Sequence, residues 1–90
     1  MHSTGHLLGL DVHDVGPYAT DGKPQPLESG ACFTIEPGLY FSTTEQRAPA
    51  HLRGIGVRIE DDVIICEDGF ENLTAAIPKR IEDVEAWMRA

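Results

Sequence analysis

The chain has 90 residues, and its 15 acidic against 7 basic side chains give a net charge of −8. This acidic balance argues against nucleic acid and membranes as partners, because both attract a basic surface. The apolar runs are far shorter than the ~20 residues that span a bilayer. Two cysteines, Cys32 and Cys66, are too few for a disulfide scaffold. We therefore expect one cytoplasmic domain, or a piece of one.

The N-terminal segment is rich in histidine. It carries three of the four histidines of the chain, His2, His6 and His13. Gly5 and Gly9 interrupt it and disfavour a long helix. Residues 16–30, which are rich in Gly, Pro and polar side chains, are predicted to form a loop.

Residues 31–41 have the composition of a β-strand. In extended geometry Phe33 and Ile35 face one way, and the side chains between them and beside them face the other, namely Cys32, Thr34 and Glu36. Pro37-Gly38 then breaks the strand, because proline has no backbone N–H for a ladder.

A strand, a turn and a return strand are predicted over residues 54–74, after a surface connection at 42–53. Asp68-Gly69 is the turn signal of this hairpin. The alternation divides the first strand into two faces: Val57, Ile59, Val63 and Ile65 on one, and Arg58, Glu60 and Asp62 on the other.

The chain ends in a predicted helix after Pro78. Its apolar face is formed by Ile81, Val84, Trp87 and Met88, and acidic residues occupy its first turn, where the helix dipole favours them. The expected fold class is therefore α+β, with a twisted antiparallel sheet and a short C-terminal helix.

Two kinds of side chain could carry chemistry. His2 and His6 have the spacing of helical zinc ligands, but no Glu follows His2 as the zincin pattern requires. The residues alone leave open whether the histidines bind a metal or substrate, or are structural or simply exposed. Glu36 and Glu60 each lie on a strand, where a glutamate either faces solvent or belongs to a site that neutralises it.

One imidazole and two carboxylates form a hard, oxygen-rich ligand set, which suits Mn²⁺, Co²⁺ or Zn²⁺. Two-metal hydrolases hold their ions with such carboxylates. Three ligands are too few for two ions.

The motifs HSTGHLLGLDVHDVG (2–16), FTIEPGLYF (33–41) and RGIGVRIEDDVIICEDGFENLT (53–74) resemble the C-terminal catalytic half of the aminopeptidase P family. This family of Xaa-Pro aminopeptidases has the pita-bread fold and is related to prolidase and methionine aminopeptidase. The resemblance implies a partial pita-bread fold for residues 1–90, as the C-terminal portion of a catalytic domain whose upstream half and N-terminal domain are absent.

The resemblance also implies roles for individual residues. His6, Glu36 and Glu60 match metal-binding residues, and Glu36 would also act as a proton shuttle. His2 and His13 match histidines of the substrate pocket, and Arg58 matches an arginine beside the metal ligands. We expect His6, Glu36 and Glu60 to converge within reach of one ion.

The implied activity is metal-assisted hydrolysis of the bond before proline, on peptides with proline at the second position. Its cofactors would be two divalent ions, Mn²⁺ with Co²⁺ or Zn²⁺ as alternatives. Two further metal-binding aspartates of the family lie upstream and have no counterpart here, so the isolated chain is expected to be inactive. A homo-oligomer or the missing upstream half would complete the site. The alternatives are a prolidase and a truncated, non-catalytic remnant of the fold.

Overall fold

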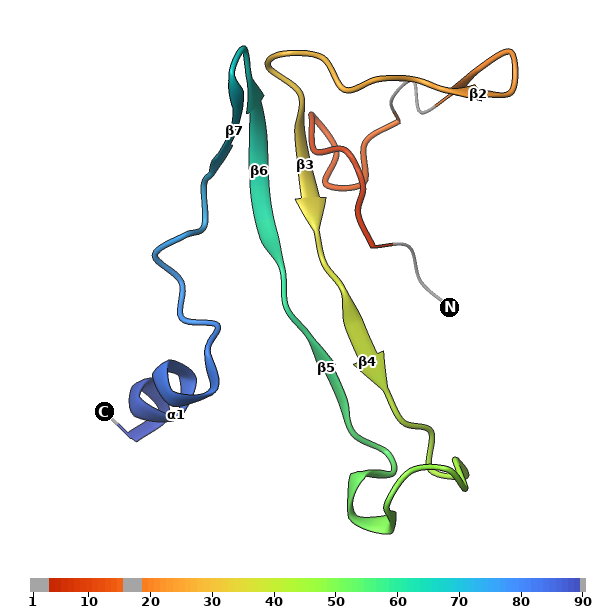
Figure 1. Ribbon diagram of the computed structural model, residues 1–90, viewed down its shortest axis with the longest axis vertical. Helices are drawn as coiled ribbons and strands as arrows, with labels where there is room; N and C mark the ends of the chain where they lie inside the picture. Colours follow the sequence, from red (N-terminus) through yellow and green to blue (C-terminus); the bar gives the residue numbers. More distant parts are fainter. Residues whose placement is uncertain (1–3, 16–18, 90) are drawn as a thin grey trace.

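The computed structural model describes residues 4–15 and 19–89 as a long antiparallel ribbon with a short helix beside it (Figure 1). Three strands form one sheet in the order β3-β6-β7, and two more form a second sheet, β4-β5. These strands are β3 (Cys32–Ile35), β4 (Gly38–Tyr40), β5 (Gly56–Arg58), β6 (Asp61–Cys66) and β7 (Gly69–Asn72). All pairings are antiparallel, which confirms the predicted α+β class with an antiparallel sheet.

The two sheets share one continuous register. Ile35 is paired with Asp61 at the end of one ladder, and Gly38 is paired with Arg58 at the start of the next. Between these two pairs the ladder is interrupted at the predicted break, because Pro37 has no N–H to donate. The carbonyl of Pro37 still accepts a hydrogen bond from the backbone N–H of Ile59 (3.1 Å). The predicted single strand through residues 54–66 is broken at the same level, so β5 and β6 are separate strands.

The predicted hairpin of β6 and β7 is present, with its turn one residue earlier than expected. Cys66 pairs with Gly69, so Glu67 and Asp68 form the two-residue turn. Gly69 has a φ of 151°, a conformation that favours glycine.

The loop predicted for residues 16–30 contains a second small hairpin. β1 (Ala19–Thr20) pairs with β2 (Lys23–Pro24) around Asp21 and Gly22, whose φ angles are 51° and 74°. Positive φ at both central residues defines the type I′ turn that Asp-Gly favours between strands. The purely loop-like prediction for this segment was therefore wrong, because the Asp-Gly turn chemistry was overlooked.

The N-terminal segment lies along the free edge of β3 as an additional extended strand. Leu7 forms an isolated bridge with Phe33, and the Thr34 amide donates to the carbonyl of His6 (2.9 Å). Gly5 permits this approach, since a Cβ there would fall against the Thr34 carbonyl oxygen. Residues 4–15 contain no helix, as predicted.

The C-terminal helix α1 (Ile81–Arg89) confirms the prediction, with Glu82 and Asp83 in its first turn and Arg89 in its last. The predicted apolar face of this helix is largely uncovered. Val84 is half-buried, but the other three members are exposed, namely Ile81, Trp87 and Met88. A 3₁₀ turn, η1 (Ala50–Leu52), is the one helical piece of the 42–53 connection. None of the described helices is long and apolar enough to cross a membrane.

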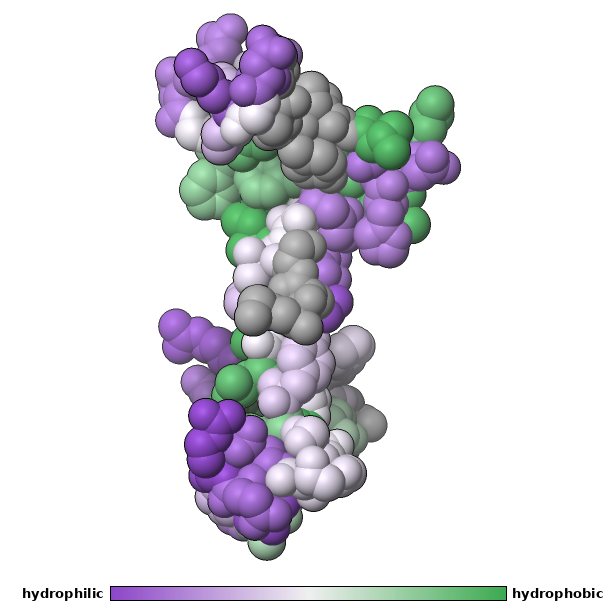
Figure 2. Space-filling view, turned by 90° about the vertical axis from the view of Figure 1, so that its right-hand side faces the viewer, coloured by the Kyte–Doolittle hydropathy of each residue, from purple (hydrophilic) through white to green (hydrophobic). Residues whose placement is uncertain are grey.

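The chain encloses little apolar surface. Among the described residues, the fully buried hydrophobic side chains are those of Ala48 and Val63. The radius of gyration is 16.8 Å, whereas a compact domain of this length has about 12 Å. Hydrophobic residues accordingly lie open on the surface shown in Figure 2.

Candidate metal centre

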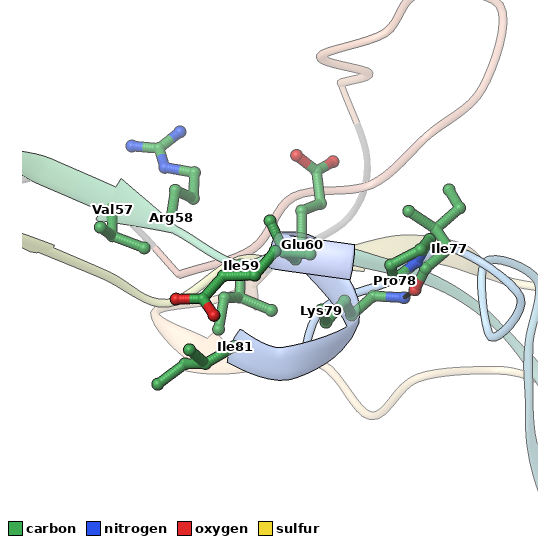
Figure 3. Close-up of a pocket in the computed structure, with 10 residues that line it drawn as sticks. Val57, Arg58, Ile59, Glu60, Ile77, Pro78, Lys79 and Ile81 are labelled. Carbon is green, nitrogen blue, oxygen red and sulfur yellow. Dashed lines mark hydrogen bonds between the residues drawn. The ribbon is translucent and has the colours of Figure 1, made fainter. Parts of the chain in front are cut away.

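The candidate ligands share one face of the ribbon. Thr34 is paired with Asp62, and continuation of this register places Glu36 opposite Glu60. In Figure 3 the side chains of Arg58 and Glu60 project to one side of the strand, and Ile59 projects to the other, toward α1. This arrangement follows from the alternation of a β-strand and agrees with the predicted faces.

His6 and Glu36 approach each other closely. Nε2 of His6 lies 3.4 Å from Oε2 of Glu36, and the two side chains are 17% and 9% exposed. Nδ1 of the same ring lies 3.1 Å from the carbonyl oxygen of Leu7. A neutral His6 that donates Nδ1–H to this carbonyl presents the Nε2 lone pair to a carboxylate oxygen. Two acceptors face each other in that state, so the pair fits a cation held between them.

Glu36 is surrounded by groups that stabilise its charge. Its Oε1 accepts a hydrogen bond from Nη1 of Arg58 (3.1 Å). A hydrogen bond with the Thr34 side chain, together with the charge of His6 in its protonated form and the charge of Arg58, lowers the pKa of Glu36 in spite of its burial. The carboxylate is therefore ionised at neutral pH, as a metal ligand must be.

Glu60 has the opposite electrostatics. Loss of hydration and repulsion from Glu36 and Asp62 raise its pKa, while His6 partly offsets the effect. Two acidic groups repel each other unless a cation lies near them. In residues 4–15 and 19–89, no three His, Cys, Asp or Glu side chains are close enough to hold an ion. The expected convergence of all three ligands is thus limited to His6 and Glu36.

The other site residues of the sequence analysis lie in different settings. The ring of His13 is exposed and lies 4.5 Å, centroid to centroid, from that of His6. Arg58 donates from Nε to the hydroxyl of Tyr40 (2.6 Å) and lies 5.6 Å from the centre of its ring. His2 lies outside the described residues.

Sequence reasoning missed three residues of this cluster. Thr34 is 1% exposed, and its Oγ1 accepts a hydrogen bond from the backbone N–H of His6 (3.1 Å). Asp62 has a buried Oδ1 without a hydrogen-bond partner in the described part of the chain. Its place on the Glu60 face was evident from the alternation, and so was the place of Thr34 beside Glu36. Tyr40, in contrast, lies beyond the Pro37-Gly38 break, and no local pattern connects it to Arg58.

A separate pocket of about 500 Å³ lies on the opposite side of the ribbon, beneath α1 (Figure 3). Its apolar wall is formed by Val57, Ile59, Ile77, Pro78, Ile81 and Val84. Arg58 and Glu60 also line the pocket, so it adjoins the strand segment that carries these two candidate site residues.

The family model of the metallopeptidase family M24 matches residues 1–67. The chain belongs to this family. The matched range contains the motifs at residues 2–16 and 33–41 and the start of the motif at 53–74. It also contains His6, Glu36 and Glu60.

Xaa-Pro aminopeptidases are among its similar relatives. Over 89 residues the chain is 53% identical to Xaa-Pro aminopeptidase 2 of Streptomyces coelicolor, covering 98% of this chain and 19% of that protein. It is 52% identical over 90 residues to the Xaa-Pro aminopeptidase of Escherichia coli, covering all of this chain and 20% of the relative. The chain thus spans about a fifth of the length of these relatives.

Solved structures confirm the partial pita-bread fold. The aminopeptidase PepP of Pseudomonas aeruginosa superposes with a TM-score of 0.90 at 46% identity, over 98% of this chain and 20% of that one. Aminopeptidase P of E. coli with the inhibitor Pro-Leu gives a TM-score of 0.87 at 52% identity, over 99% and 20%. The chain therefore has the fold of one segment of these enzymes.

Proposed function

We propose that this chain supplies three ligands, His6, Glu36 and Glu60, to the two-metal site of an Xaa-Pro aminopeptidase. The observation that carries the proposal is the approach of His6 Nε2 to Glu36 Oε2, 3.4 Å apart and largely shielded from water. Such a pair could supply two ligands to one cation, because Nε2 of a neutral His6 that carries its proton on Nδ1 and Oε2 of Glu36 are both acceptors. Membership of a metallopeptidase family supports the same conclusion.

The proposed cofactors are two divalent ions, with Mn²⁺ favoured and Co²⁺ or Zn²⁺ as alternatives. Imidazole and carboxylate ligands suit all three ions. One relative, the E. coli aminopeptidase P, has been studied in a Zn-substituted form with product. When bound, the ions would activate water and polarise the peptide carbonyl.

The residues of this chain would bind the substrate and transfer a proton from the attacking water to the leaving amine. Glu36, whose pKa is lowered, is ionised and would accept this proton at a carboxylate oxygen and pass it to the amine. His13, beside the ring of His6, and His2 would bind the peptide and stabilise developing charge. Arg58 would hold Glu36 in place through its contact with Oε1.

The proposed substrate is a peptide with proline at its second position, and the remaining ligands would come from another part of the enzyme. Residues 1–90 would then be the C-terminal portion of the catalytic domain, completed by an upstream half or by a second copy. The coverage of about a fifth of the relatives supports this division. So does the small ligand set, since three ligands under-coordinate two ions.

The two alternatives to this proposal are a prolidase and a non-catalytic remnant of the fold. The relatives named above are Xaa-Pro aminopeptidases, which does not favour prolidase activity. A non-catalytic role of the chain by itself is favoured by the lack of any three-ligand group among the described residues.

A cytoplasmic location is supported by the free thiols of Cys32 and Cys66. The relative from Arabidopsis thaliana is named as mitochondrial, so an organelle is the alternative location.

The test is a chimera in which residues 1–90 replace the matching segment of the E. coli Xaa-Pro aminopeptidase, which is 52% identical over this length. We expect the chimera to bind two Mn²⁺ ions by titration calorimetry and to hydrolyse a Gly-Pro peptide. The chain alone should bind at most one ion weakly and show no turnover.

Substitution separates the ligands from the rest of the surface. Glu60→Gln in the chimera should abolish activity, because a neutral amide is a poor substitute for a carboxylate ligand. Glu67→Gln in the exposed β6–β7 turn removes the same charge and should leave activity unchanged. An inactive parent chimera, or full activity in Glu60→Gln, would refute the proposal.

A further inference from the structure

The hydroxyl of Thr34 connects His6 to the strand that leads into Glu36, although the two candidate ligands are 30 residues apart in the chain. Thr34 Oγ1 accepts a hydrogen bond from the backbone N–H of His6 (3.1 Å). Thr34 and Glu36 are two residues apart and share one face of the extended segment, because successive side chains of a strand alternate. The hydrogen bond therefore holds His6 beside the face that carries Glu36.

The position of Thr34 makes this connection rigid. The residue is 1% exposed, and it lies between two neighbours, with the N-terminal segment on one side and Asp62 of β6 on the other. The backbone of Thr34 also donates to the carbonyl of His6 (2.9 Å). Both the backbone and the side chain of one residue thus determine where His6 lies relative to β3.

We propose that Thr34 is a positioning residue that holds His6 against β3 and so sets its imidazole at the separation from Glu36 that a shared metal ion requires. The inference rests on the proposed function of His6 and Glu36. In this role Thr34 acts through His6 rather than on the substrate or the metal itself. Partners that orient metal ligands in this way generally change metal affinity or activity by about 10–100-fold when they are removed.

The matched control is another threonine whose hydroxyl accepts a hydrogen bond from a backbone N–H of a distant segment. Thr74 Oγ1 accepts from the backbone N–H of Asp62 (3.1 Å), and it also donates to Asp61 Oδ1 (2.6 Å). Thr74→Val thus removes a hydrogen bond of the same kind, at residues that are not proposed ligands. A loss that is merely structural should be similar in Thr34→Val and Thr74→Val.

The experiment uses the active chimera described above. Thr34→Val removes the hydroxyl while keeping the branched shape, and we expect Mn²⁺ affinity or kcat to fall by about 10–100-fold with KM little changed. Thr34→Ser keeps the hydroxyl and should restore most of the activity, and Thr74→Val should keep kcat. The absorption spectrum of the Co²⁺-loaded protein should change in Thr34→Val alone, because it reports ligand geometry.

Each outcome has a defined meaning. Unchanged kcat, Mn²⁺ affinity and Co²⁺ spectrum in a folded Thr34→Val would overturn the inference while leaving the proposed function intact. If Thr34→Val does not fold, Thr34→Ser decides: near-parent activity supports the role of the hydroxyl, and a loss of about tenfold or more contradicts it. A parent chimera without Mn²⁺ binding or turnover would refute the proposed function and the role of Thr34 together.

Discussion

Glu36 and Glu60 lie opposite each other at the interruption between the β3–β6 and β4–β5 ladders. The pairs that flank them, Ile35 with Asp61 and Gly38 with Arg58, define this relationship. The two carboxylates differ in their ionisation, because the pKa of Glu36 is lowered and that of Glu60 is raised. The irregular stretch of the ribbon thus brings two acidic groups together where Arg58 can compensate only one of them.

Removal of Arg58 should change the ionisation of Glu36. In Arg58→Met we expect the pKa of Glu36 to rise. The guanidinium of Arg58 stabilises the ionised carboxylate of Glu36, and the substitution removes this stabilisation. The measurement is a carboxyl ¹³C NMR titration. Arg47→Met is the control: Arg47 holds the pKa of Glu45 at about 2, so this variant should raise the pKa of Glu45 and leave Glu36 unchanged. An unaltered Glu36 titration in Arg58→Met would contradict the contact.

Gly5→Ala should loosen the N-terminal segment from β3. The new Cβ would press on the Thr34 carbonyl oxygen, and such overpacking generally costs about 1–3 kcal/mol. The amides of Thr34 and Glu36, which donate to His6 and Thr4, should then exchange faster with solvent. Amides of the β6–β7 ladder serve as the internal control and should be unaffected. Equal protection in both proteins would show that the approach is less close than described.

Lys79 should stabilise the chain in a pH-dependent way. Its Nζ lies 2.7 Å from Oδ1 of Asp61, and hydrogen bonds from Lys79 and Thr74 lower the pKa of Asp61. A lowered folded-state pKa contributes stability above the unfolded value of about 3.9, and this contribution is lost as the pH falls through the folded value.

The difference in unfolding free energy between the parent and Lys79→Met should therefore be present at neutral pH and shrink below about pH 4, as measured by urea titration. Arg80→Met changes an exposed neighbour whose ion pair with Glu82 is long, at 3.9 Å. It should change the stability by less than about 0.5 kcal/mol. A pH-independent effect of Lys79→Met would argue against the ion pair as its cause.

The exposed apolar surface should make the isolated chain associate. Leu39, Val57 and Ile59 are 64%, 57% and 46% exposed and line one shallow depression, whereas soluble monomers rarely expose large apolar patches. Light scattering should detect association, and Val57→Glu should reduce it. Thr44→Glu adds the same charge at an exposed site of the 42–53 connection and should have a smaller effect. A monomer that melts cooperatively would count against this prediction.

The sequence by itself determined the local structure and the face on which each candidate residue lies. Alternation separated Phe33 and Ile35 from Glu36, and it placed Arg58 and Glu60 together, because successive side chains of a strand point to opposite faces. Pro37 marked the break and the pattern after Pro78 marked the helix, since both signals depend on a few neighbouring residues.

Only the tertiary structure decided which of these residues meet. Nothing local shows that residues 4–8 lie along β3, that His6 approaches Glu36, or that Arg58 reaches both Glu36 and Tyr40. These contacts join residues 18 to 32 positions apart in the chain. Their register depends on the pairing of whole strands, and a shift of one residue would move every side chain to the other face. The geometry of the site is therefore a property of strand pairing, which the local pattern of residues does not encode.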